Sequence, residues 1–184
     1  MIETRPGLIR IREAAKRSPR LRFNNLFHHL DVALLREAYR HLKRSAAPGV
    51  DGVDWAGYGE ELDKNLEVLA RRLHTQGYRT QAVLCQWIPK ANSQRRPIGI
   101  TTVEDKVVQQ TVVWVLEAIY EREFLGFSYG FRPGRSQHDA LDAVYMAVTT
   151  RKVSWVLDAD IGQYIPALRL RPMGAPMAKT RSQR

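Results

Sequence analysis

The sequence predicts an α+β protein in which amphipathic helices accompany one β-hairpin and a final buried strand. Apolar residues recur at intervals of three or four across residues 8–44 and 61–77, which is the spacing of one helix face. The period then changes to two, and residues 83–101 alternate as strands do. Helical spacing returns after Thr101 and gives way to a strand pattern at residues 153–161. Helix and strand signals in this order favour the α+β class.

Several residues predict where these elements begin and end. Pro19 is expected to divide the helical segment 8–44, because proline removes a backbone donor. Gly77 is placed to end the helix over 61–77. Thr101 with Glu104 is expected to form a capping box for a helix over 104–125. The expected core face of the helix over 61–77 comprises four leucines, Leu62, Leu66, Leu69 and Leu73.

Two segments rich in Gly and Pro are predicted to be loops, and the hairpin has its own turn. The first loop contains Pro48, Gly49 and Gly52 within five residues. The second spans "GFSYGFRPGRS" and ends at Ser136, a predicted N-cap for a helix over 138–150. That helix is expected to place four apolar residues on one face, Leu141, Val144, Tyr145 and Val148. Inside the hairpin, "ANSQ" supplies turn residues.

Positive charge is concentrated at the two ends of the chain. The formal net charge is +10; residues 1–44 carry 11 Lys/Arg against 4 Asp/Glu, and residues 169–184 carry 5 Lys/Arg and no acid. Clustered positive charge is typical of proteins that bind polyanions, most often nucleic acid, although a solvated basic surface would have the same composition. A single cysteine, Cys85, excludes an intrachain disulfide framework and is expected to lie in the core. With no apolar run near the length of a membrane span, no membrane partner is expected, and the chain is expected to be cytoplasmic.

The end of the strand at 153–161 carries two acids. Asp158 and Asp160 are two positions apart, so they project from the same face, roughly 7 Å apart at their Cα atoms. Mg²⁺ binds through one or two carboxylates together with phosphate oxygens, so a metal site is one interpretation. The alternative is that one Asp caps a following helix or pairs with an Arg. Glu104 and Asp105 open a helix, where acids favour the helix dipole without any catalytic meaning.

A two-metal site needs carboxylates from at least two segments of chain. The sequence has no adjacent Asp-Asp pair and no acidic residue after Asp160. Any metal site built on Asp160 is therefore incomplete within these 184 residues.

Four blocks, in order, resemble the N-terminal half of group II intron reverse transcriptases (maturases). They are "APGVDG", "WIPKANSQRRPIGITTVEDKVVQQ", "FSYGFRPGRSQHDAL" and "WVLDADI", and the resemblance extends over about residues 5 to 164. It implies a right-hand polymerase fold, with the fingers followed by the first strand of the palm. It also implies RNA-directed DNA synthesis with Mg²⁺, and intron RNA, an RNA template and a DNA primer as partners. Nothing in the sequence sets the oligomeric state.

The resemblance also implies roles for individual residues. Lys90 and Arg96 match positions that contact the nucleotide triphosphate, the alternative being a solvent-exposed basic hairpin. Asp160 matches the first catalytic Asp of the palm, with the backbone carbonyl of Ile161 completing its metal site. Six further residues match segments close to template or primer: Pro48, Gly49, Gly52, Arg132, Gly134 and Arg135. The loop at 46–52 could instead be a simple connector.

The two arginines have an alternative as well. Arg132 and Arg135 could tie the fold to Asp139 or Asp142 rather than contact nucleic acid. Three aromatic residues alternate beside them, Phe127, Tyr129 and Phe131. Such aromatics can stack on nucleobases, but core packing is expected for at least two of them.

The resemblance stops before Ile165, and it divides the chain into four expected regions. They are a basic helical extension (1–45), a fingers region with the template loop and hairpin (46–152), the first palm strand (153–164) and a disordered, unrelated basic tail (165–184). The tail resembles read-through after a frameshift, or else a diverged terminus. The expected function is that of a truncated, inactive reverse transcriptase fragment, and the alternative is a non-catalytic RNA-binding module.

Overall fold

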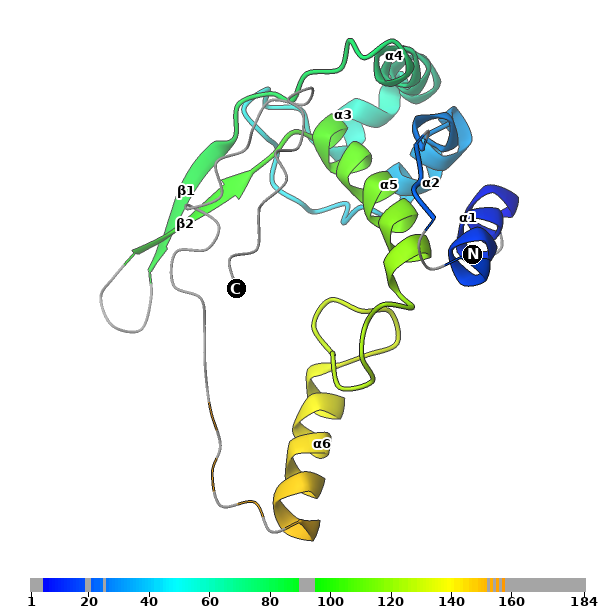
Figure 1. The fold of residues 1–184 in the computed structure, drawn as a ribbon. Coiled ribbons are helices and arrows are strands. Elements are labelled where there is room, and N and C mark those ends of the chain that lie inside the picture. The colour runs from blue at the N-terminus through cyan, green and yellow to red at the C-terminus, as the bar shows by residue number, and fades with distance from the viewer. Residues whose placement is uncertain are drawn as a thin grey trace, which may run out of the picture. The chain divides into compact units, whose positions relative to one another are not determined.

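Six α-helices, one 3₁₀ turn and one antiparallel hairpin make up the described part of the computed structural model (Figure 1). The structure describes residues 5–18, 21–24, 26–89 and 95–151, together with 153, 155 and 157. In chain order the elements are α1 (Pro6–Arg17), η2 (Phe27–His29), α2 (Val32–His41), α3 (Trp55–Glu60), α4 (Leu62–His74), β1 (Leu84–Pro89), β2 (Arg95–Ile100), α5 (Val103–Tyr120) and α6 (Gln137–Thr150). The predicted α+β class is confirmed at this level. No helix in these ranges is long and apolar enough to cross a bilayer.

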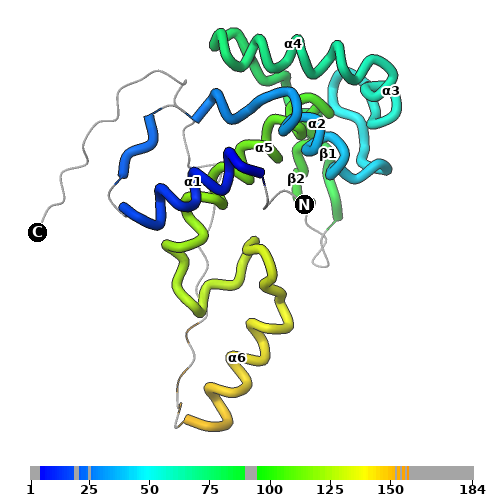
Figure 2. Tube along the Cα trace, turned by 90° about the vertical axis from the view of Figure 1, so that its right-hand side faces the viewer, coloured from blue at the N-terminus to red at the C-terminus, as the bar shows by residue number. Residues whose placement is uncertain are grey.

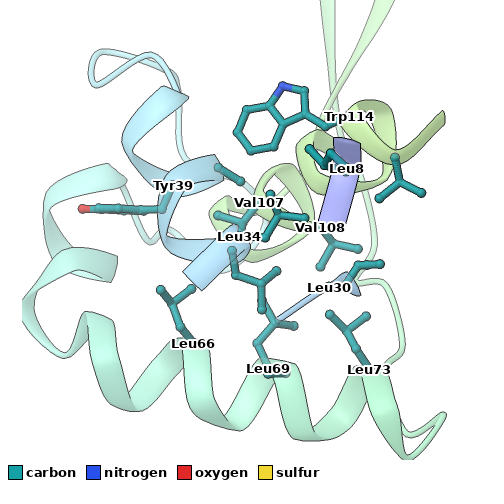
Figure 3. Close-up of a cluster of buried hydrophobic side chains, with 14 of the residues drawn as sticks. Leu8, Leu30, Leu34, Tyr39, Leu66, Leu69, Leu73, Val107, Val108 and Trp114 are labelled. Atoms are coloured by element: carbon teal, nitrogen blue, oxygen red, sulfur yellow. The ribbon is translucent and has the colours of Figure 1, made fainter. Parts of the chain in front are cut away.

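The chain divides into two units, Met1–Pro133 and Gly134–Arg184. The first contains a core in which α2 packs against both α4 and α5, and α5 also packs against α1 (Figure 2). Figure 3 shows the leucines of α4 pointing toward Leu34 of α2 and Val107 of α5. Three of the four predicted leucines are buried and Leu62 is partly buried. Each fully buried Leu contributes about 2 kcal/mol, so this face accounts for much of the association of these helices.

Side-chain caps explain where several helices begin. The carboxylate of Asp31 accepts the Leu34 N–H at 2.6 Å and starts α2, and Asp54 accepts the Gly57 N–H at 2.8 Å to start α3. Ser136 starts α6, as the sequence predicts, and Asp139 completes a capping box with it.

The predicted capping box at the start of α5 is wrong by one residue. Thr102, not Thr101, is the N-cap, and its Oγ1 accepts the Asp105 N–H at 3.2 Å. Neither nearby acid returns a hydrogen bond to the cap, because both have partners elsewhere: Glu104 pairs with Arg72, and Asp105 accepts from Tyr78. Local spacing favoured Glu104, but these tertiary partners lie about thirty residues earlier in the chain.

The end of α4 is a Schellman motif whose left-handed residue is glutamine. The Gly77 N–H donates to the Arg72 carbonyl at 2.8 Å and the Gln76 N–H to the Leu73 carbonyl at 3.3 Å. Gln76 has a φ of 57°, so the position with positive φ precedes the glycine that the sequence singles out. A side chain at such a φ is strained by about 1 kcal/mol.

Substituting Gln76→Gly is therefore expected to stabilise the protein by about 1 kcal/mol, because glycine adopts this φ without steric cost. Urea unfolding would measure the change. Gln76→Ala keeps the Cβ and is the matched control, with little expected gain. An equal gain in both variants would contradict strain at φ as the cause.

The hairpin pairs Leu84 with Ile100 and Pro89 with Arg95, and it projects from the helices of its unit (Figure 1). All the strand residues are exposed except Ile100, which is half-buried. Cys85 is exposed as well, so its expected place in the core is wrong. No second layer of described residues covers either face of the ribbon. Neither set of alternating side chains is therefore buried.

In the second unit, the apolar face expected for α6 is exposed. Leu141, Val144, Tyr145 and Val148 are all exposed. Three residues of the expected strand over 153–161 are described, Val153, Trp155 and Leu157. None is in a strand, and Trp155 is 91% exposed. An isolated strand has no ladder to stabilise it, which accounts for this difference.

Candidate nucleic-acid interface

The loop over residues 46–52 is fastened to the start of α5. Gly49 is buried, and a Cβ at this position would lie 2.6 Å from the Thr102 backbone nitrogen and 2.9 Å from the Thr101 carbonyl carbon. The Lys106 Nζ donates to the Ala47 carbonyl at 2.7 Å. The Gly52 N–H closes the turn on the Gly49 carbonyl at 3.1 Å. The base of the loop is therefore fixed against the first turn of α5.

The two glycines of this loop are favoured for different structural reasons. Gly49 allows close approach to the protein's own backbone, whereas Gly52 has a φ of +70° with open space where a Cβ would lie. Pro48 and Val50, which flank Gly49, are exposed. The surface that the loop offers to a ligand thus consists of its tip rather than Gly49 itself.

Substituting Gly49→Ala is expected to lower the free energy of unfolding by about 2 kcal/mol, because three backbone atoms at 2.6–2.9 Å must move. Urea unfolding of the variant would measure this loss. Val50→Ala, at the exposed neighbouring position, is the control and should change stability by less than about 0.5 kcal/mol. A tolerated Gly49→Ala would contradict the tight packing.

Arg96 lies on β2 opposite Ile88 and is exposed. Its predicted companion Lys90 lies outside the described residues. Arg96 and Arg95 occupy neighbouring positions on the strand, so their side chains leave opposite faces of the ribbon near the turn. The described end of the hairpin is therefore cationic on both faces.

A buried carboxylate anchors the foot of the hairpin, a role that the sequence did not reveal. Asp105 is 2% exposed; it accepts a short hydrogen bond from the Tyr78 hydroxyl and a second, at 3.3 Å, from the Gln81 N–H. Burial and this hydrogen bond hold the pKa of Tyr78 well above its usual value, so the phenol stays neutral and donates. The segment that leads into β1 is thus tied to α5, which follows β2.

Arg132 closes the loop that follows α5. Its Nε and Nη2 donate to the Glu121 carboxylate, the shortest contact being 2.8 Å. Its Nη1 donates to the carbonyls of Leu125 at 2.9 Å and Ser128 at 2.7 Å. The guanidinium also lies 5.2 Å from the centre of the Phe124 ring. With its side chain only 7% exposed, Arg132 holds the loop together, and any contact with nucleic acid would have to compete with these bonds.

Aromatic residues project from the loop that Arg132 closes. Phe127 and Phe131 are exposed and Tyr129 is half-buried, so the expected core packing of two of these three is wrong. Phe131 has a φ of 56°, which is strained for an aromatic residue. The alternative to nucleic-acid contact paired Arg132 or Arg135 with Asp139 or Asp142, but the carboxylate that Arg132 binds belongs to Glu121.

Gly134 and Arg135 open the second unit. Gly134 has a φ of +66° and nothing close to the place of a Cβ, so the turn favours glycine there because of its backbone conformation. Arg135 is exposed, and its charge contributes to lowering the pKa of Asp139, for which the hydrogen bonds from Ser136 are the main cause. These two residues therefore belong to the turn that precedes the α6 capping box.

The predicted metal site lies outside the described residues. Asp158, Asp160 and Ile161 are all in this position. Within the described ranges, no group of three or more His, Cys, Asp or Glu is placed to hold a metal ion. The described side chains by themselves therefore do not form a metal site.

Sequence comparison relates this chain to known proteins. Over 132 residues the chain is 33% identical to Protein YkfC of Escherichia coli K12, which covers 70% of this chain and 35% of YkfC. Over 128 residues it is 36% identical to the group II intron-encoded protein LtrA of Lactococcus lactis, which covers 67% of this chain and 20% of LtrA. The chain is homologous to group II intron reverse transcriptases and maturases. The chain thus spans about a third of the length of YkfC and a fifth of the length of LtrA.

A shorter match points to the same family. Over 44 residues this group II intron homologue is 41% identical to nuclear intron maturase 2, a mitochondrial protein of Arabidopsis thaliana, covering 24% of this chain and 6% of that protein. No protein-family model matches the chain.

Proposed function

We propose that this chain corresponds to the fingers of a group II intron reverse transcriptase and to the segment that begins its palm. Such an enzyme copies RNA into DNA by nucleotidyl transfer, and its partners are intron RNA, an RNA template and a DNA primer. The observation that carries the proposal is the homology to LtrA, together with the order of the four sequence blocks. Asp160 would be the first metal-binding carboxylate, with the Ile161 carbonyl beside it.

The geometry of the described residues supports binding more directly than catalysis. A braced loop, a cationic hairpin end and an Arg-closed aromatic loop are features suited to a polyanion with exposed bases. Arg96, with Lys90, would contact the triphosphate, because a guanidinium fork and a point charge both suit phosphate oxygens. Pro48, Gly52, Gly134 and Arg135 would lie near template or primer, while Gly49 and Arg132 would act through the shape of their loops.

The 184-residue polypeptide alone is proposed to be inactive as a polymerase, since it has no adjacent Asp-Asp pair and no acid after Asp160. Primer extension with an RNA template, a DNA primer, nucleotides and Mg²⁺ tests this directly. We expect no product from the pure chain. Processive extension that is lost in Asp160→Asn would overturn the proposed inactivity and identify Asp160 as catalytic.

A non-catalytic RNA-binding module is the second candidate, favoured by the concentration of positive charge at the chain ends. Binding of a labelled single-stranded RNA across a salt series tests it. A polyanion contact predicts that log K falls linearly with log salt, with a slope of about −0.7 for each phosphate neutralised. A slope near zero, or no binding, would contradict this candidate.

A further inference from the structure

A cavity of about 380 Å³ lies between the first turns of α1, the η2 turn and the start of α2. Basic and titratable side chains dominate its lining: Arg5, Arg10, His28, His29 and one acid, Asp31. A second cavity, of about 540 Å³, shares Arg10 and both histidines and adds Arg22. Three arginines and two imidazoles thus surround adjoining spaces that contain one carboxylate.

The contacts in this pocket leave positive charge in excess. Arg5 Nη1 lies 3.2 Å from Asp31 Oδ1, so the single carboxylate is already paired, and it also caps α2. The rings of His28 and His29 lie 3.8 Å apart between their centres, at 41°. Arg10 is exposed, and its Nε donates to the Pro6 carbonyl at a long 3.4 Å.

Two positive imidazoles at this distance would repel each other and Arg10. Burial lowers the pKa of His29 below 6.5, and the charges of His28 and Arg10 lower it further, while Asp31 opposes them. An anion between these groups would reverse the repulsion and favour protonation. Gly7 forms part of the wall, since a Cβ there would lie 3.2 Å from His29 Nδ1. No described side chain caps the start of α1, so its first N–H groups add to the positive potential.

We propose that the pocket formed by Arg5, Arg10, His28 and His29 binds a backbone phosphate of RNA. The choice of RNA rests on the proposed function, whereas the binding of a phosphate group rests on the pocket alone. The ligand chemistry is a tetrahedral oxyanion that accepts hydrogen bonds from guanidinium and imidazolium groups. Asp31 would keep Arg5 oriented rather than contact the phosphate.

Matched arginine substitutions on α1 test the contact with RNA. Arg10→Gln removes a cation from the pocket, whereas Arg12→Gln removes one from an exposed position of the same helix that lines neither cavity. With a labelled single-stranded RNA, Arg10→Gln is expected to reduce the salt slope by about 0.7, which is about fivefold in affinity at 0.1 M salt. Arg12→Gln should leave the slope unchanged. Equal losses in both variants would indicate a diffuse basic surface and overturn the proposal.

Histidine substitutions test the pH dependence. The charged or titratable groups around the two rings are Arg5 and Arg10 on α1, Asp31 at the start of α2, Arg22, and His74 of α4, whose Nε2 lies 3.1 Å from the Phe27 carbonyl. RNA affinity is expected to rise as the pH falls below 6.5, because burial and the neighbouring positive charges hold the pKa of His29 beneath that value. The double variant His28→Gln/His29→Gln should remove that rise. A rise retained in the double variant would overturn the role of the pair.

Inorganic phosphate separates the pocket from the proposed function. In wild-type protein, phosphate is expected to shift the imidazole NMR signals of His28 and His29 saturably, and Arg10→Gln should weaken that response. No saturable shift in folded wild-type protein, with folding checked by circular dichroism, would overturn the site. A saturable shift without any RNA binding would uphold the phosphate site and overturn both the RNA assignment and the proposed RNA-binding function.

Discussion

Substituting Arg132→Ala is expected to release the loop that follows α5 and to raise its amide hydrogen exchange about 100-fold, or about 3 kcal/mol in local opening. The guanidinium donates to the Glu121 carboxylate and to the Leu125 and Ser128 carbonyls, so its loss leaves all three without this partner. The Ser128 amide, which donates to Leu125 within the same loop, is the most direct probe.

Two controls separate the geometry of Arg132 from its charge. Arg132→Lys keeps the charge but cannot hold a carboxylate and two carbonyls at once, so it should lose much of the protection. Arg17→Ala removes an exposed arginine whose ion pair with Glu13 is 3.7 Å long, and it should change stability by less than about 0.5 kcal/mol. Normal loop protection in Arg132→Ala, accompanied by weaker RNA binding, would contradict a structural role and favour direct contact with RNA.

Substituting Asp105→Ala is expected to lower the free energy of unfolding by about 3 kcal/mol, because Tyr78 and the Gln81 N–H lose a buried acceptor. Tyr78→Phe removes one of these hydrogen bonds and should cost about 1–2 kcal/mol. The double variant should cost less than the sum of the two by about 1 kcal/mol, as expected for directly coupled residues. Additive losses, measured by urea unfolding, would contradict the bond between them.

The same pair predicts a dependence on alkaline pH. The pKa of Tyr78 is raised in the folded state from its ordinary value of 10.0, so its contribution to stability is complete below pH 10 and is lost as the pH rises above that value. Tyr78→Phe should therefore show a shallower loss of stability above pH 10 than the wild type. Tyr39 and Tyr58, whose pKa values burial also raises, are expected to contribute to the dependence that remains.

Features that depend on neighbouring residues in the chain were predictable. The leucine face of α4, the Ser136 cap of α6 and the hairpin over residues 83–101 follow from local spacing, and the structure contains all three. The loop at 46–52 is present as well, and Gly52 has the positive φ that its turn demands. These signals are local because helix faces, caps and turns join residues only a few positions apart.

Partners that lie far apart in the chain were not predictable. Asp105 was interpreted as an acid favouring the helix dipole, but it anchors Tyr78, and Glu104 pairs with Arg72 rather than with a cap. The alternative for Arg132, a tie to Asp139 or Asp142, named other carboxylates than that of Glu121. In each case the sequence does not show which acidic and which partner side chains meet, because tertiary packing decides it.

The sequence by itself determined the family, the α+β class and the charge at the chain ends, because ordered blocks, periodicity and composition are properties of the chain. Only the tertiary structure decided what individual residues do. In the structure, Gly49 packs against the backbone of Thr101 and Thr102, and Arg132 holds its loop together by hydrogen bonds. His28 and His29 line a basic pocket. The physical reason is that a side chain's role depends on which distant groups packing brings within hydrogen-bonding or van der Waals distance.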